Sequence, residues 1–179
     1  PELQNDFTFP DFGLRLMKGI PMLFFGGRDS HTFMHYDIDL ANIFHFHFEG
    51  TKQVILFDQK QNDYLYKIPH ALITREDIDF NNPDFEKWPM LKKAKGYKTE
   101  LKHGEVLYMP EGYWHYMRYI TPGFSMSLRA IARNPKNFSK AVYNLLIMRN
   151  YDTLMRRLKG QKWIDWKNEQ AIIKTHKAL

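Results

Sequence analysis

Two histidines and one aspartate have the residue types and the spacing of a metal site. His35 and Asp37 are separated by one residue, and His115 follows much later, after a turn that contains Pro110 and Gly112. On a strand, side chains two positions apart point to the same face, so we expect His35 and Asp37 to face one interior. Two imidazoles and one carboxylate can occupy one face of an octahedral metal ion and leave three positions for oxygen and an organic acid. The pattern predicts a non-haem Fe(II) site of the kind that oxygenases use.

An interpretation without a metal stays open for these residues. His35 and Asp37 can form a simple hydrogen-bonded pair, and His115 can be a buried histidine with a polar partner. Short motifs match by chance, so an isolated His-x-Asp has little specificity. The metal interpretation is favoured because the second motif, which ends at His115, is separated from the first by sequence typical of strands.

The residues between 22 and 131 have the composition of β-structure that such a site needs. Short aromatic and β-branched runs alternate with Gly, Pro, Asn and Asp, which are typical of turns. We predict eight strands, at residues 22–25, 32–36, 42–48, 53–57, 97–101, 106–109, 114–119 and 124–131. Eight strands at this spacing are typical of a double-sheet jelly roll or barrel. A long connection at 77–95 is expected to be functional or to cover the sheets.

The pattern becomes helical after Ala132. Asn134 is a good N-cap and Pro135 suits the first helical position, and apolar residues then recur at three- and four-residue intervals. We predict a second helix at 152–160, where a glycine ends it, and a third at about 164–174. The fold class is therefore mainly β, with a C-terminal helical appendage.

The balance of basic and acidic residues also changes near residue 132. Residues 133–179 contain 11 basic and 3 acidic side chains, a net charge of +8, whereas residues 1–132 have a net charge of −2. We expect a β-domain at 1–132 and a helical appendage at 133–179 that packs on it or forms a dimer interface. A basic tail can contact nucleic acid or an acidic protein. The basic residues here alternate with apolar ones, which favours solvated helix faces and leaves nucleic acid as the alternative.

The composition narrows the class of protein. Of the 179 residues, 44% are hydrophobic and 16% are aromatic, which excludes intrinsic disorder. The chain has no cysteine, which excludes disulfides, thiolate zinc sites and a cysteine nucleophile, and fits a cytoplasmic location. The longest uncharged apolar stretches are too short to cross a membrane, so we expect no membrane partner. The first residue is Pro rather than Met, as in a processed form or an excised fragment.

Four segments of the chain, in matching order and spacing, resemble the JmjC-type cupin-like hydroxylases. They are residues 32–37, 50–52, 79–89 and 104–115. The last of these segments also resembles the second cupin motif, with Gly104, Pro110 and His115 at its spacing. Within the family, the likeness is greatest to the asparaginyl hydroxylase branch that inhibits hypoxia-inducible factor. The resemblance implies a double-stranded β-helix, bound Fe(II) and the cosubstrate 2-oxoglutarate.

The resemblance also implies roles for individual residues. His35, Asp37 and His115 would be the iron ligands and the catalytic centre. Lys52 and Thr32 would bind the distal carboxylate of 2-oxoglutarate, which needs a buried cation and a hydroxyl donor. The implied reaction is hydroxylation of a C–H bond, with a protein side chain favoured as the substrate. Related hydroxylases dimerise through C-terminal helices, so we expect a homodimer.

Three further residues are expected near the cosubstrate. Asn42 matches a family Asn, unless the extra residue in this segment moves that position to Ile43. His45 is expected to line the pocket beside it. Arg129 stands where the family has a second Asn, and it either supplies another cation to the cosubstrate or points away.

A rival metal set leads to a different class of protein. His45 and His47 share a strand face and, together with His115, resemble the three-histidine set of ordinary cupins. Such a chain would be a non-hydroxylating cupin, either an isomerase or a small-molecule dioxygenase. We favour the first set because the rival leaves Asp37 and Lys52 without roles. A third class is a non-enzymatic binding module with a basic tail.

Overall fold

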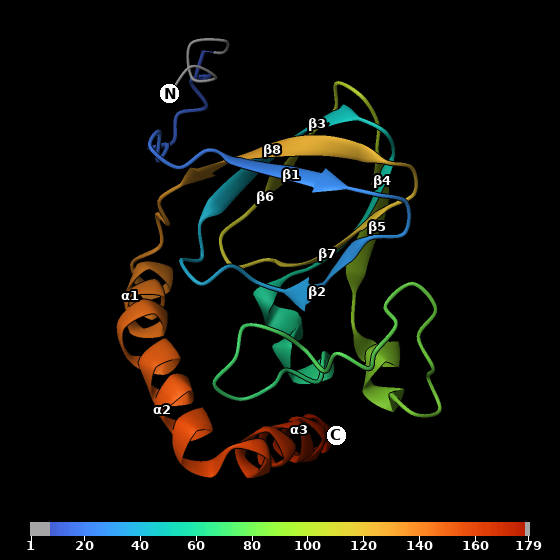
Figure 1. The fold of residues 1–179 in the computed structure, drawn as a ribbon, viewed down its shortest axis with the longest axis vertical. Helices are drawn as coiled ribbons and strands as arrows, with labels where there is room; N and C mark the ends of the chain where they lie inside the picture. The colour runs from blue at the N-terminus through green and yellow to red at the C-terminus, as the bar shows by residue number, and fades with distance from the viewer. Residues whose placement is uncertain (1–7, 178–179) are drawn as a thin grey trace.

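The structure, a computed structural model, describes residues 8–177, in which two antiparallel four-stranded sheets face each other (Figure 1). The first sheet contains, in order, β1 (Met22–Gly26), β8 (Gly123–Ala130), β3 (Asn42–Glu49) and β6 (Val106–Met109). The second contains β2 (His31–His35), β7 (Trp114–Tyr119), β4 (Lys52–Phe57) and β5 (Gly96–Leu101). All eight predicted strands and the jelly-roll fold are confirmed. The outermost parts of the two predicted domains, residues 1–7 and 178–179, lie outside the described residues.

Polar side chains line the space between the two sheets. Successive residues of a strand point to opposite faces, so every second residue of β3, β4 and β8 points inward. Six of these inward residues are buried although they are polar or charged, namely His45, His47, Lys52, Ser125, Ser127 and Arg129. The interior of two packed sheets is ordinarily filled by apolar side chains. Apolar side chains, among them Ile43, Val54 and Met117, fill another part of this interior, so the polar part indicates a binding site.

The main apolar core lies on the outer face of the second sheet. Tyr116 of β7 and Ile55 of β4 belong to this core, together with residues of the connection between β4 and β5. The connection contains two short 3-10 helices, η2 (Gln59–Tyr64) and η3 (Pro89–Lys93). The buried apolar side chains that it contributes to this core are Leu65, Tyr66, Ile78, Phe80, Trp88, Met90 and Leu91. The long connection predicted at 77–95 therefore covers a sheet face.

The C-terminal part of the chain is helical. Its elements are α1 (Pro135–Tyr143), the π-helical segment η4 (Asn144–Met148), α2 (Arg149–Lys159) and α3 (Gln161–His176). The first three run on without a break and form one long helix (Figure 1).

The predicted start of the first helix is confirmed, and the prediction of a separate second helix is wrong. The side chain of Asn134 caps α1 by accepting a hydrogen bond from the N–H of Lys136 at 2.9 Å. We predicted a separate second helix from residue 152, but no Gly or Pro interrupts residues 136–159, so the helix continues. It ends at Gly160, as predicted, where φ is +54°.

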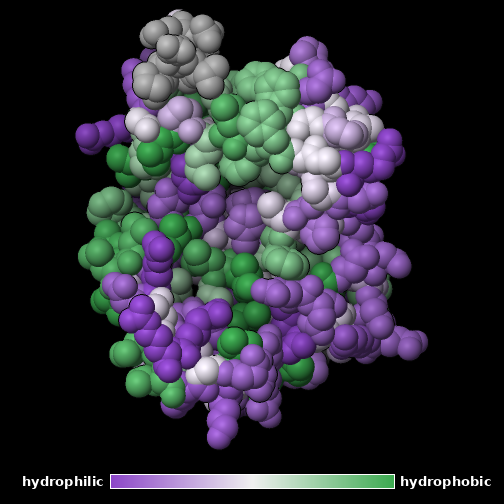
Figure 2. Space-filling model, viewed as in Figure 1, coloured by the Kyte–Doolittle hydropathy of each residue, from purple (hydrophilic) through white to green (hydrophobic). Residues whose placement is uncertain are grey.

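The helices cover one side of the roll. Ala141 and Ile172 pack into the apolar core of the second sheet, and the hydroxyl of Tyr66 lies 3.3 Å from Nε2 of His176. Hydrophobic side chains also gather on the outer side of the long helix (Figure 2). Among residues 8–177, none of the helices combines the length and the apolar character that a membrane crossing requires.

Candidate metal centre

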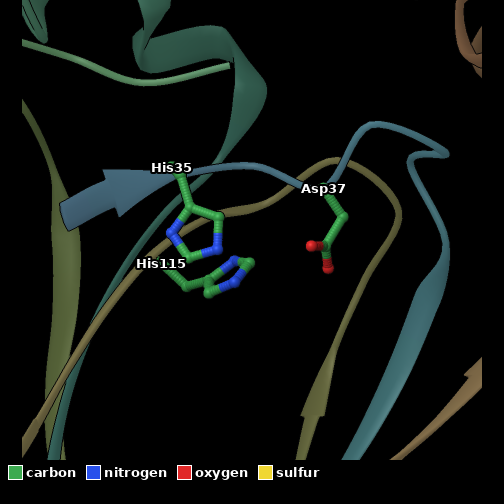
Figure 3. A group of neighbouring side chains, drawn as sticks. All are labelled: His35, Asp37 and His115. Carbon is green, nitrogen blue, oxygen red and sulfur yellow. The ribbon is translucent and has the colours of Figure 1, made fainter. Parts of the chain in front are cut away.

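The structure brings the three predicted ligands together. His35 lies at the end of β2, Asp37 lies in the loop after it, and His115 lies at the start of β7 (Figure 3). One potential ligand atom from each side chain lies within 4.8 Å of the others. Across residues 8–177, no other group of three histidine or acidic side chains has this arrangement.

The pairing of β2 with β7 places the two imidazoles side by side. His35 lies directly opposite His115 in the sheet, and the centroids of their rings are 4.1 Å apart. The register shifts by one residue between Thr32 and His35, which is a β-bulge. A bulge of this kind turns a side chain toward a site that regular alternation would not reach.

The turn before β7 fixes the start of that strand. Gly112 has a φ of +67°, a conformation that L side chains rarely adopt. A Cβ atom at this position would also collide with the side chain of Gln59. The glycine of the predicted motif therefore delivers His115 to its place three residues later.

Asp37 is placed by a loop rather than by strand alternation. β2 ends at His35, although the N–H of Tyr36 still donates to the carbonyl of Leu72 at 3.0 Å. The chain then turns, and the N–H of Leu40 donates to the carbonyl of Asp37 at 3.0 Å. Strand alternation therefore does not place Asp37, although the side chains of His35 and Asp37 both line the same cavity.

Within residues 8–177, the hydrogen bonds of His35 and His115 leave one nitrogen of each imidazole free for a metal. Nδ1 of His35 lies 2.7 Å from the carbonyl of Phe33, and Nδ1 of His115 lies 3.2 Å from the carbonyl of Tyr113. A carbonyl only accepts, so each Nδ1 carries the proton and each Nε2 keeps its lone pair. Burial, and next the nearby His35, lower the pKa of His115 to about 4, so this ring is neutral at pH 7. Two imidazoles that each present Nε2, together with one carboxylate, fit a divalent metal ion such as Fe(II).

A cavity of about 490 Å³ adjoins the three side chains and is lined by most of the other predicted site residues. Thr32, His45, Lys52 and Arg129 contribute polar groups to its wall. Its apolar lining includes Met22, Leu23, Phe24, Phe25, Met109 and Met117. The metal-ligand group and a set of basic and hydroxyl side chains therefore share one chamber.

Lys52 places a buried positive charge in this cavity. The side chain is 2% exposed, and Nζ donates to Oγ of Ser125 at 2.6 Å and to Nε2 of His45 at 3.0 Å. Nζ also lies 4.1 Å from the ring centroid of Tyr119. None of the ion pairs among residues 8–177 includes Lys52, and burial lowers its pKa to about 8. A buried cation without a counter-ion is costly, so this ammonium fits a carboxylate from a ligand.

Asn42 lies on the opposite face of β3 from the cavity. Its side-chain oxygen accepts a hydrogen bond from the hydroxyl of Tyr108 at 2.7 Å, and its Nδ2 donates to Glu111 at 3.3 Å. The adjacent Ile43 lines the cavity instead. Of the two placements that the sequence left open for this position, the structure puts Ile43 inside.

Protein hydrogen bonds occupy both nitrogens of His45 and of His47. In His45, Nδ1 lies 2.7 Å from Oγ of Ser127, and Nε2 accepts from Lys52. In His47, Nδ1 lies 3.1 Å from Oγ of Ser125, and Nε2 donates to the carbonyl of Gly50 at 3.0 Å. Burial is the main cause that lowers the pKa of both rings, to about 2 in His45. The rival three-histidine set is therefore not assembled around a shared point.

The sequence did not point to three residues that hold this site together. Ser125 and Ser127 bind the buried histidines, and Asp39 binds Arg129. The two serines stand two residues apart on β8, so their alternation was a usable signal for an inward polar face. Nothing in the sequence marked Asp39 apart from its position two residues after Asp37.

Comparisons with known proteins agree with this geometry. The family model described as "Cupin-like domain" matches residues 1–156. The chain is 33% identical over 138 residues to Jumonji C domain-containing protein 5 of Drosophila melanogaster, covering 71% of this chain and 33% of that protein. It is 31% identical over 125 residues to human HSPB1-associated protein 1, covering 68% of this chain and 25% of that protein.

A third relative has a different kind of name. The chain is 30% identical over 115 residues to tRNA wybutosine-synthesizing protein 5 of Gallus gallus, covering 64% of this chain and 35% of that protein. The chain thus spans only a quarter to about a third of the length of these relatives. It belongs to the JmjC-type cupin-like family. The narrower likeness to an asparaginyl hydroxylase stays a prediction.

Proposed function

We propose that the chain is an Fe(II)- and 2-oxoglutarate-dependent oxygenase that hydroxylates a C–H bond of its substrate. The observation that carries the proposal is the pairing, in one cavity, of a two-histidine, one-carboxylate group with a buried lysine that lacks a counter-ion. Bound Fe(II) would supply the oxidation chemistry, for which 2-oxoglutarate and dioxygen are the co-reactants.

The cavity residues have distinct tasks in this proposal. Nε2 of His35, Nε2 of His115 and the carboxylate of Asp37 hold the metal. The ammonium of Lys52 pairs with the distal carboxylate of 2-oxoglutarate, and the hydroxyl of Thr32 hydrogen-bonds to it. His45 accepts a hydrogen bond from Lys52 at 3.0 Å, which orients the ammonium without neutralising its charge. Arg129, which the sequence placed near the cosubstrate, is engaged in ion pairs with Asp37 and Asp39.

The substrate is proposed by class only. A protein side chain remains the favoured substrate, and the apolar lining from β1 suits the aliphatic part of such a group. The relative named for tRNA wybutosine synthesis makes a nucleic-acid base the alternative, and the basic helical appendage fits either partner. A reducing, cytoplasmic setting is part of the proposal because the metal must remain Fe(II).

Succinate release tests the proposal directly. The purified chain is incubated with Fe(II), ascorbate and labelled 2-oxoglutarate, and succinate is measured without added substrate. We expect slow turnover that Asp37→Ala abolishes and that Asp63→Ala, at an exposed aspartate outside the cavity, leaves unchanged. Bound iron without succinate would favour the non-hydroxylating cupin, and a chain that binds no metal would favour the binding module.

We also propose that the chain forms a homodimer through the outer side of its long helix. Apolar side chains there are strongly exposed for a monomer, with Leu146 at 66% and Leu158 at 71%. Phe138, Val142, Leu145, Ile147 and Leu154 belong to the same exposed set. Light scattering is expected to give the mass of two chains, and Leu146→Glu should reduce it to one. A wild-type mass of one chain contradicts the dimer.

A further inference from the structure

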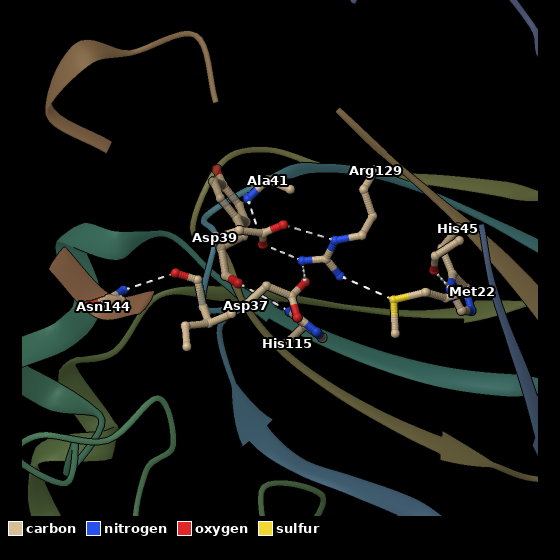
Figure 4. A network of polar contacts seen from close by, with 11 residues as sticks. Met22, Asp37, Asp39, Ala41, His45, His115, Arg129 and Asn144 are labelled. Atoms are coloured by element: carbon tan, nitrogen blue, oxygen red, sulfur yellow. Dashed lines mark hydrogen bonds and ion pairs between the residues drawn. The ribbon is translucent and has the colours of Figure 1, made fainter. Parts of the chain in front are cut away.

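The carboxylate of Asp37 is held by a side chain from the opposite sheet. Arg129, on β8, extends across the interior, and its Nη2 lies 3.3 Å from Oδ2 of Asp37 (Figure 4). The same guanidinium grips Asp39, with Nε 3.1 Å from Oδ2 and Nη2 in a shorter contact with Oδ1. The Arg129 side chain is only 9% exposed. One buried arginine therefore connects two carboxylates of the loop after β2.

Further hydrogen bonds and a strained backbone residue hold the loop that carries Asp37 and Asp39. Oδ1 of Asp39 accepts the N–H of Ala41 at 3.4 Å. The carbonyl of Ile38 accepts Nδ2 of Asn144 at 3.2 Å, from the π-helical segment η4. Leu40, fully buried, has a φ of +46°, which a free loop would avoid. Such strain persists only where the surroundings hold the backbone in place.

The carboxylates of Asp37 and Asp39 make different contacts with Arg129. Asp39 accepts hydrogen bonds from Nε and Nη2 of the guanidinium, which is the strong two-bond geometry of an Arg–carboxylate pair. Asp37 receives one contact, at Oδ2. No hydrogen bond or ion pair among residues 8–177 involves Oδ1 of Asp37, so this oxygen is left for a metal.

We propose that Arg129 is a positioning residue for the metal-binding carboxylate and does not bind the cosubstrate. Asp39 neutralises and orients Arg129, and Arg129 in turn holds Oδ2 of Asp37 so that Oδ1 faces the two free imidazole nitrogens. Groups that hydrogen-bond to a metal ligand orient it, and their removal weakens metal binding. The inference rests on the proposed metal centre and is independent of whether the chain turns over 2-oxoglutarate.

Two variants test the proposed roles of Arg129 and Asp39. The metal affinity of each variant is measured by Co(II) titration of the metal-free chain. Arg129→Gln is expected to weaken Co(II) binding about 10–100-fold and to change the Co(II) visible spectrum, because Asp37 loses its fixed orientation. Asp39→Asn is expected to weaken binding as well, because Nε and Nη2 of Arg129 can then both bind the carboxylate of Asp37 and compete with the metal. The matched control Arg118→Gln removes the exposed ion pair with Asp29 and should leave affinity and spectrum unchanged.

The outcomes separate this inference from the proposed function. Weakened Co(II) binding in both variants, with an unaltered apparent KM for 2-oxoglutarate, supports the positioning role. Wild-type Co(II) affinity in Arg129→Gln, together with a raised KM for 2-oxoglutarate, overturns it and makes Arg129 a cosubstrate residue. Should Arg129→Gln not fold, as judged by circular dichroism, Asp39→Asn alone decides by the same criteria. A wild-type chain that binds no Co(II) overturns the metal centre and this inference together.

Discussion

The two pairs of histidines inside the roll differ in what their ring nitrogens contact. In His35 and His115, Nδ1 contacts a backbone carbonyl two residues earlier in the chain, and Nε2 has no hydrogen-bond partner among the described residues. His45 and His47 have both nitrogens in hydrogen bonds with serine, lysine or carbonyl groups. Hydrogen-bond partners, rather than residue type or burial, therefore decide which of these histidines can bind a metal.

The largest expected difference between the pairs is in metal-dependent stability. Binding at a metal concentration of 100 times Kd raises the free energy of unfolding by about 2.7 kcal/mol. We expect Co(II) to stabilise the wild-type chain by this amount and to leave His115→Ala unaffected. His47→Ala should be less stable without metal yet keep the Co(II)-dependent gain. Thermal unfolding with and without Co(II) measures both, and the reverse pattern would make His47 the ligand.

The next-largest effect concerns Lys52, whose ammonium donates a hydrogen bond to Nε2 of His45. Lys52→Met should raise the concentration of 2-oxoglutarate needed for half-maximal succinate release by at least about 100-fold, since losing one partner of a buried ion pair costs roughly 3–5 kcal/mol. Co(II) affinity should not change. Lys67→Met is the matched control, because burial also lowers the pKa of Lys67 to about 8 but Lys67 does not line the cavity. Equal effects from both lysines would contradict the assignment.

Lys52 also predicts a pH dependence of stability in the ligand-free chain. Its pKa is about 8 in the folded chain, against an ordinary value of 10.5, because burial disfavours the charged form. The unfolded chain therefore binds more protons between pH 8 and 10.5, so this lysine's contribution to stability rises with pH across that window. Urea unfolding of wild type and Lys52→Met should show the difference in slope. Parallel curves would mean that Lys52 is not buried as a cation.

The smallest expected effect separates structural from metal-binding histidines. Ser127→Ala removes the partner of Nδ1 of His45 and leaves a buried donor unsatisfied, which costs about 1–3 kcal/mol of unfolding free energy. Co(II) affinity should be unchanged because His45 is not a ligand in the proposed metal centre. Urea unfolding and Co(II) titration of the same preparation check both statements. A loss of Co(II) affinity here would place His45 in the metal site.

Local sequence was sufficient for most of the fold. The eight strands follow from alternating aromatic and β-branched runs between turn residues, and the N-cap at Asn134 follows from a two-residue signal. The sequence predicted a separate helix from residue 152, whereas residues 136–159 belong to one continuous helix. The error arose because helix ends are weakly marked unless Gly or Pro is present. The placement of Asn42 was also uncertain, since a single extra residue in a strand reverses which face a side chain occupies.

By itself, the sequence determined the two motifs that carry His35, Asp37 and His115, and the strands that bring them near one another. Only the tertiary structure decided, for the described part of the chain, which imidazole nitrogens are free, that Lys52 has no counter-ion and that Arg129 contacts Asp37. The reason is physical. These contacts join residues far apart in the chain, such as His45 with Ser127 at a separation of 82 and Arg129 with Asp39 at 90. Side-chain hydrogen bonds and charge pairs depend on such neighbours, which strand patterns do not specify.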